Sequence, residues 1–102
     1  MSDFYILDSD NNPITATMEE WSKFNGDRCT KRVAFDENDD VRVSTVFLGM
    51  NHNWGEGPPI LFETMIFGGD HDEYQWRYVT WDEAIAGHKS ACLVAGIKHE
   101  KE

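Results

Sequence analysis

The stretch from residue 41 to residue 69, VRVSTVFLGMNHNWGEGPPILFETMIFGG, constrains the fold of this chain most strongly. It holds two apolar runs, residues 41–48 and 60–67, which are rich in the β-branched and aromatic residues typical of strands. Between them, residues 49–59 contain several glycines, prolines and asparagines, which favour turns and loops. We therefore predict a β-hairpin whose two strands are joined by a long loop.

The alternation of side chains in this hairpin predicts which residues face the core. Successive residues of a strand point to opposite faces of a sheet, so one face of the first strand carries Val41, Val43, Thr45 and Phe47. In the second strand both faces are apolar apart from Glu63 and Thr64. Because apolar residues on both faces are typical of covered central strands, we predict a helix over one face and loops or a second copy of the chain over the other.

Two capping boxes, each a threonine followed three residues later by a glutamate, mark the starts of two helices. In such a box the hydroxyl and the carboxylate each accept a hydrogen bond from the other residue's backbone N–H. The pairs are Thr17 with Glu20 and Thr80 with Glu83, and they predict helices over Met18–Asn25 and Trp81–Ala95.

The second helix carries an apolar stripe that includes His88, which we predict to be a core histidine satisfied by hydrogen bonds. Gly87 is unfavourable inside a helix, and we expect it to let the helix and the sheet approach closely. Gly96 is expected to end the helix, with Ile97 packing back on Cys92.

Two more strands, over residues 31–36 and 74–79, complete the predicted sheet. A short apolar run, Phe4–Leu7, precedes them and ends in a cluster of turn-forming residues. The predicted fold is α+β: a four-stranded antiparallel meander with a short N-terminal helix and a longer C-terminal helix packed on the sheet. With 102 residues, the chain is expected to form a single domain, residues 1–102.

The chain carries 19 acidic and 9 basic residues, and its net charge is −10. Such a charge repels the phosphates of nucleic acids and of anionic membranes, so we expect no direct binding to either. The excess of acidic residues either serves solubility alone or imitates a nucleic acid in a partner's binding groove, and the sequence leaves both interpretations open. The candidate acidic surface consists of Asp36, Glu37, Asp39, Asp40, Asp70, Asp72 and Glu73.

Signals of cofactor and metal chemistry are missing from the sequence. The two cysteines, Cys29 and Cys92, do not form a Cys-x-x-Cys motif, and there is no metal-spaced pair of histidines, phosphate-binding glycine loop or Gly-x-Ser-x-Gly motif. We therefore expect no cofactor, no metal and no enzymatic activity. No secretory signal and no apolar run near the ~20 residues of a membrane helix are present, which favours the cytoplasm.

The remaining candidates for chemistry are in or near the hairpin. The loop offers a binding surface made of Asn51, His52, Asn53, Trp54 and Glu56. Glu63 lies in an apolar strand and needs a partner, since an ionised carboxylate is costly to bury alone. A pair of Glu63 with His52 is either a catalytic dyad or a structural lock, and Arg77 is the other predicted partner, in a buried polar pair.

Three segments of the chain carry a resemblance to a known group of proteins: STVFLG (44–49), GPPILFETM (57–65) and RYVTWDEA (77–84). His52 lies between the first two, and Gly87-His88 follows the third. This pattern resembles a group of small proteins from tailed bacteriophages and prophages, and with similarities near residues 5–8, 21 and 32–34 it covers most of the chain. Members of that group often have aspartate before the loop histidine, whereas this chain has Asn51, which weakens a carboxylate-assisted role for His52.

The resemblance implies a phage origin, and small acidic phage proteins without a catalytic signature usually act by binding. We expect a non-enzymatic accessory protein, in the cytoplasm of the infected bacterium, that inhibits an anti-phage defence component such as a CRISPR–Cas complex. Its partner is expected to be a host protein with a basic nucleic-acid-binding surface, and a homodimer is a further expectation. The alternatives are a protein that sequesters a nucleotide signal, a small hydrolase using His52 and Glu63, and a virion or assembly component.

Overall fold

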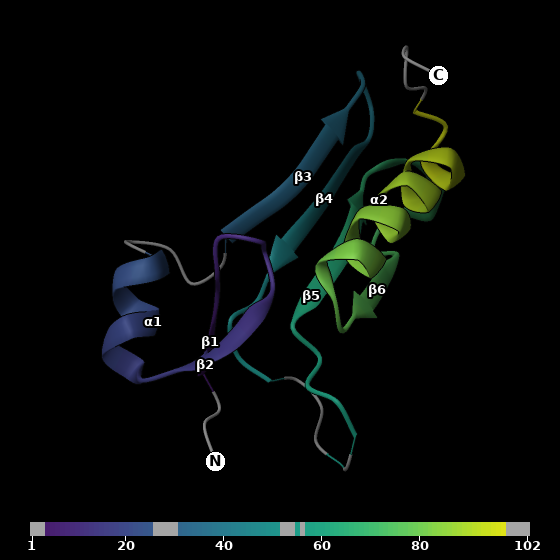
Figure 1. Ribbon diagram of the computed structural model, residues 1–102. Helices are drawn as coiled ribbons and strands as arrows, with labels where there is room; N and C mark the ends of the chain where they lie inside the picture. Colours follow the sequence, from purple (N-terminus) through teal and green to yellow (C-terminus); the bar gives the residue numbers. More distant parts are fainter. Residues whose placement is uncertain (1–3, 26–30, 52–54, 56, 98–102) are drawn as a thin grey trace.

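The computed structural model describes residues 4–25, 31–51, 55 and 57–97 of the chain, and the structural statements below refer to these residues (Figure 1). The elements in chain order are β1 (Phe4–Leu7), β2 (Pro13–Ala16), α1 (Met18–Asn25), β3 (Lys31–Glu37), β4 (Arg42–Phe47), β5 (Phe62–Phe67), the 3₁₀ helix η1 (Gly69–His71), β6 (Gln75–Tyr78) and α2 (Trp81–Ala95).

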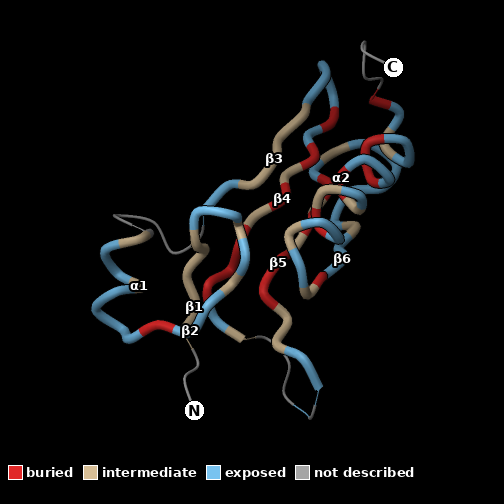
Figure 2. The backbone as a smooth tube through the Cα atoms, in the orientation of Figure 1, coloured by how far each residue is buried: buried red, intermediate tan, exposed pale blue. Residues whose placement is uncertain are grey.

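Strands β3 to β6 form one antiparallel sheet in the order β3-β4-β5-β6, and α2 packs along one of its faces (Figure 1). The predicted α+β class, the four-stranded meander and the two helices are thus confirmed. The face under α2 is the core face, and Figure 2 shows buried positions along β4 and β5 and along α2. Its fully buried strand residues are Val43, Thr45, Phe47, Phe62, Thr64 and Ile66.

The β1–β2 hairpin is a separate two-stranded sheet, and its second strand is not among the predicted elements. The backbone N–H of Tyr5 donates to the carbonyl of Gly49 at 2.8 Å, which attaches β1 to the loop after β4. Tyr5 and Leu7, together with Phe24 of α1, pack against the buried cluster that contains Phe47 and Phe62, and the Phe24 ring contacts that of Phe47. The hairpin and α1 therefore extend the hydrophobic core beyond the N-terminal end of α2.

The opposite face of the sheet lies open. Ser44, Val46, Glu63 and Met65 are only half-buried, and the Phe67 side chain is exposed. Within the described residues no loop buries this face, so the prediction of a covering loop is wrong for that part of the chain. Its coverage by a second copy of the chain stays a prediction.

Both capping boxes form as predicted. At α2, the Glu83 N–H donates to the Thr80 hydroxyl at 3.1 Å, and the Glu83 carboxylate accepts from the Thr80 N–H at 3.3 Å. The Glu83 carboxylate also accepts from the Val79 N–H at 3.0 Å. At the other end, Gly96 adopts a left-handed conformation with φ of 83°, and the Ile97 N–H donates to the Cys92 carbonyl at 2.9 Å. The predicted end of the helix is confirmed.

Replacing Thr80 with alanine is expected to lower the free energy of unfolding by about 1 kcal/mol, because it removes the N-cap acceptor of α2. Urea denaturation followed by circular dichroism measures this loss. Thr80→Ser keeps the hydroxyl and should retain most of the stability, so an equal loss in both variants would contradict the capping role.

Candidate functional site

Of the predicted binding loop, the structure describes Asn51 but not His52, Asn53, Trp54 or Glu56, whose role therefore stays a prediction. The Asn51 side-chain oxygen accepts a hydrogen bond from the backbone N–H of Ile60 at 3.1 Å, which joins the two ends of the loop. Asn51 is half-buried, so it acts as an internal clamp and is not a freely presented contact residue.

The predicted pair of Glu63 and Arg77 forms, but on the open face of the sheet. The two residues face each other across β5 and β6, and the Arg77 Nε donates to the Glu63 Oε2 at 3.0 Å. The Gln75 side-chain amide donates to the same carboxylate oxygen. The Arg77 side chain is 43% exposed and that of Glu63 13%, so the prediction of a buried pair is wrong on the arginine side. A cross-strand pair of this kind contributes roughly 0.2–1 kcal/mol to stability.

Two acidic turns meet at one end of the sheet. In an antiparallel meander the turn between β3 and β4 and the turn between β5 and β6 lie at the same end. Close packing of the backbone holds them together, because a Cβ atom on Gly68 would collide with the carbonyl of Asp40 and one on Gly69 with Val41. We call this region the acidic end; its exposed carboxylates are Glu37, Asp39, Asp40, Asp70, Asp72 and Glu73.

Local hydrogen bonds fix the shape of the acidic end. The Asn38 side-chain oxygen accepts from the N–H groups of Asp40 at 3.1 Å and Val41 at 3.0 Å. The Asp72 carboxylate accepts from the Gly68 N–H at 2.7 Å. Residues of both turns line a shallow hollow of about 450 Å³, whose walls include Glu37, Asp39, Asp40 and Asp72. The carboxylates are thus displayed on an ordered surface rather than on two independent turns.

The charge around this hollow is strongly negative. Arg42 is the cation that lines it, and His71 of η1 is the other basic side chain of the two turns. The C-terminal half of α2 lies at the same end, in contact with η1 (Figure 1). Since the carbonyl end of a helix carries a partial negative charge, α2 adds to the field of the carboxylates.

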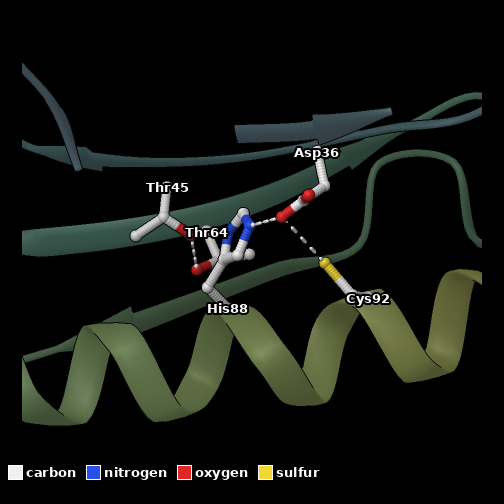
Figure 3. A network of polar contacts seen from close by, with 5 residues as sticks. All are labelled: Asp36, Thr45, Thr64, His88 and Cys92. Carbon is white, nitrogen blue, oxygen red and sulfur yellow. Dashed lines mark hydrogen bonds and ion pairs between the residues drawn. The ribbon is translucent and has the colours of Figure 1, made fainter. Parts of the chain in front are cut away.

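Asp36 belongs to a different site, which corrects its predicted place on the acidic surface. Its side chain is 34% exposed and turns toward α2, where its Oδ2 accepts from the Nε2 of His88 at 2.8 Å (Figure 3). The Cys92 thiol also points to this oxygen, at 3.6 Å. Asp36 reaches this position because β3 pairs it with Val43, on the core side of β4.

His88 connects Asp36 to a chain of buried hydroxyl groups (Figure 3). Its Nδ1 lies 2.7 Å from the Thr45 hydroxyl, which lies 2.5 Å from the hydroxyl of Thr64. His88 is 3% exposed and both threonines are fully buried, so the expectation of a core histidine satisfied by hydrogen bonds is confirmed. Burying these groups would be costly without such partners.

The hydroxyl–imidazole–carboxylate series Thr45–His88–Asp36 has the members of a hydrolytic triad but not its arrangement. The imidazole Nδ1 faces the hydroxyl and Nε2 faces the carboxylate, the reverse of the serine protease order. The Thr45 side chain is fully buried, so a substrate has no access to its oxygen in this conformation. The geometry indicates a polar link between sheet and helix rather than a nucleophile.

The thiol of Cys92 is held in its protonated form. Burial raises the pKa of Cys92 to about 12, and the negative charge of Asp36 and its hydrogen bond with the thiol act in the same direction. Because the thiolate is the reactive form of cysteine, this thiol is a poor nucleophile in the structure as it stands.

Sequence reasoning did not single out the group of Asp36, His88 and Cys92. The available signal was the spacing of His88 and Cys92, four residues apart on one helix face. The third member depends on the pairing of β3 with β4, which the sequence pattern does not supply.

No protein-family model matches this chain, and neither a curated protein nor a solved structure matches it. Among the described helices, none has the length and apolar character needed to cross a membrane.

Proposed function

We propose that this protein is a non-enzymatic binding protein whose acidic end occupies the basic, nucleic-acid-binding surface of a host protein. In this proposal it is a phage accessory protein that inhibits an anti-phage defence component, such as a CRISPR–Cas complex, in the bacterial cytoplasm. The observation that carries the proposal is the convergence of six exposed carboxylates from two turns on one ordered end of the sheet.

Electrostatic complementarity supports this choice of partner. A concentrated negative field steers a protein toward basic surfaces and repels nucleic acids and other acidic proteins. Nucleic-acid-binding grooves carry the matching arrangement of lysine and arginine side chains. Binding is favoured over catalysis because the triad-like group has no accessible nucleophile and because Arg77 and Gln75 already engage Glu63.

Neutralising three carboxylates of the acidic end tests this proposal. Glu37→Gln, Asp39→Asn and Asp70→Asn remove charge from both turns, and none of these carboxylates accepts a hydrogen bond within the described part of the chain. We expect the triple variant to bind a host nucleic-acid-binding protein about 10- to 100-fold more weakly, at up to about 1 kcal/mol for each charge. Surface plasmon resonance at several salt concentrations measures the loss, and DNA or RNA should compete for the same partner.

A matched control removes the same charge elsewhere. Asp10→Asn, Glu19→Gln and Asp82→Asn lie in the β1–β2 turn and in the first turns of α1 and α2, and all three are exposed. The control should bind like the unmodified protein. Equal weakening in both triple variants, or a partner for which nucleic acid does not compete, would contradict the proposal.

A further inference from the structure

Asp36, His88 and Cys92 bring three different metal-binding atoms together between β3 and α2 (Figure 3). The Asp36 Oδ2 lies 2.8 Å from the His88 Nε2 and 3.6 Å from the Cys92 Sγ, and all three atoms lie within 4.8 Å of one another. His88 and Cys92 are four residues apart on one face of α2, while Asp36 approaches from the edge strand of the sheet.

We propose that these three side chains form a zinc-binding site with one coordination position left for water or an external ligand. Carboxylate oxygen, imidazole nitrogen and thiolate sulfur are the protein ligands of Zn²⁺, whereas Mg²⁺ and Ca²⁺ prefer oxygen alone. The Cys92 thiol, protonated in the metal-free protein, releases its proton to solvent when the ion binds. Three protein ligands plus one exchangeable position are typical of zinc sites that are open to solvent.

Two of the three distances between the ligand atoms are close to those around a tetrahedral ion. With usual zinc–ligand lengths, the sulfur and oxygen ligands of such an ion are about 3.6 Å apart, and the nitrogen and oxygen ligands about 3.4 Å apart. The Cys92 Sγ and Asp36 Oδ2 already have the first separation. The His88 Nε2 and Asp36 Oδ2 need to move apart by only about 0.6 Å, as the ion replaces the proton between them.

The surroundings of His88 orient it for this role. A zinc-bound histidine usually donates its second ring N–H to a fixed acceptor, and the Thr45 hydroxyl lies 2.7 Å from the Nδ1. The Thr45 hydroxyl can accept from Nδ1 while it donates its own hydrogen bond to the Thr64 hydroxyl. The hydroxyl chain therefore accommodates a histidine that donates from Nδ1 and leaves Nε2 for the metal. Thr45 is thus a positioning residue for the site.

An ion also has a route of entry. His88 and Cys92 are buried, but the Asp36 side chain is 34% exposed and forms the solvent-facing side of the group. A metal arriving there would join β3, an edge strand of the sheet, to the middle of α2. We therefore expect zinc to raise the melting temperature of the protein as well as to bind.

The test uses the full chain without an affinity tag, reduced and treated with a chelator that is then removed. Isothermal titration with Zn²⁺ should give one ion per chain, and titration with Co²⁺ should give the absorption of a tetrahedral ion with a thiolate ligand. Cys92→Ala and Asp36→Asn should each weaken zinc binding by more than the roughly 10- to 100-fold that a lost outer-shell partner costs.

Two controls separate the site from other donors and from misfolding. The double variant Cys29→Ser and His71→Gln removes a thiol and an imidazole that are not among the three proposed ligands, and it should bind zinc unchanged. Asp36→Asn keeps an oxygen acceptor for His88 at a partly exposed position, so circular dichroism should show a folded chain. Absence of stoichiometric zinc binding, a cobalt spectrum without a thiolate band, or unchanged zinc affinity in folded Asp36→Asn would overturn the proposal.

Discussion

Replacing His88 with alanine is expected to lower the free energy of unfolding by about 3 to 4 kcal/mol. The imidazole is 3% exposed, so its removal leaves a cavity between the sheet and α2. It also removes the hydrogen bonds that link Thr45 to Asp36. The Thr45 hydroxyl then keeps Thr64 as its partner, while water can replace His88 at the partly exposed Asp36.

Urea denaturation with a metal chelator present measures this loss apart from any contribution of a bound ion. Thr45→Val keeps the volume of the side chain but leaves the His88 Nδ1 without a hydrogen bond, and it should cost about 1 to 3 kcal/mol. His71→Ala replaces an exposed histidine of η1 and should stay within about 0.5 kcal/mol of the unmodified protein. A loss below about 1 kcal/mol for His88→Ala would mean that the buried network does not stabilise the fold.

Local signals in the sequence were sufficient for most of the fold. The helices have the predicted bounds, since capping boxes and a terminal glycine act within a few residues of the helix ends they define. Strand β2 was missed because its four residues, PITA, hold little strand signal of their own and depend on pairing with β1. The turn-forming residues before Pro13 indicate where the chain reverses, but they do not indicate that the residues after the turn pair with β1.

The sequence pattern could not predict which face of the sheet Asp36 occupies, because the pairing of β3 with β4 is irregular. Strict alternation would place Val33 and Phe35 on the core face and Asp36 on the other. The pairing with β4 shifts by one residue between Arg32 and Ala34, so Val33 packs toward the core while Phe35 faces the open side and Asp36 turns to α2. A one-residue shift moves every side chain beyond it to the opposite face of the sheet, and the local sequence of β3 does not predict such a shift.

The acidic end, in contrast, follows from topology once the meander is accepted. The acidic residues were identified from the sequence, and the first and third turns of an antiparallel meander necessarily share an end of the sheet. What the sequence could not supply is the close contact of the two turns through Gly68 and Gly69. That contact requires the backbone at Gly68, which has no side chain, to approach the backbone at Asp40, 28 residues earlier in the chain.

Replacing Gly87 with valine is expected to destabilise the fold by about 2 to 3 kcal/mol, although valine is the better helix former. A Cβ atom at this position would overlap the ring and hydroxyl of Tyr78, which is 9% exposed. To accept the new side chain, α2 must move away from β6 or Tyr78 must leave its place in the core, and either change disturbs the packing between the helix and the sheet.

The same substitution at the neighbouring exposed position, Ala86→Val, measures the cost of valine in the helix alone and should stay below about 0.7 kcal/mol. A double-mutant cycle then tests the cause, because Tyr78→Ala removes the group that Gly87→Val would meet. If the clash is with Tyr78, the loss of stability in the double variant will be smaller than the sum of the two single losses by at least about 1 kcal/mol. Additive losses would place the strain elsewhere on α2 and would remove Gly87 as the residue that sets the distance between the helix and the sheet.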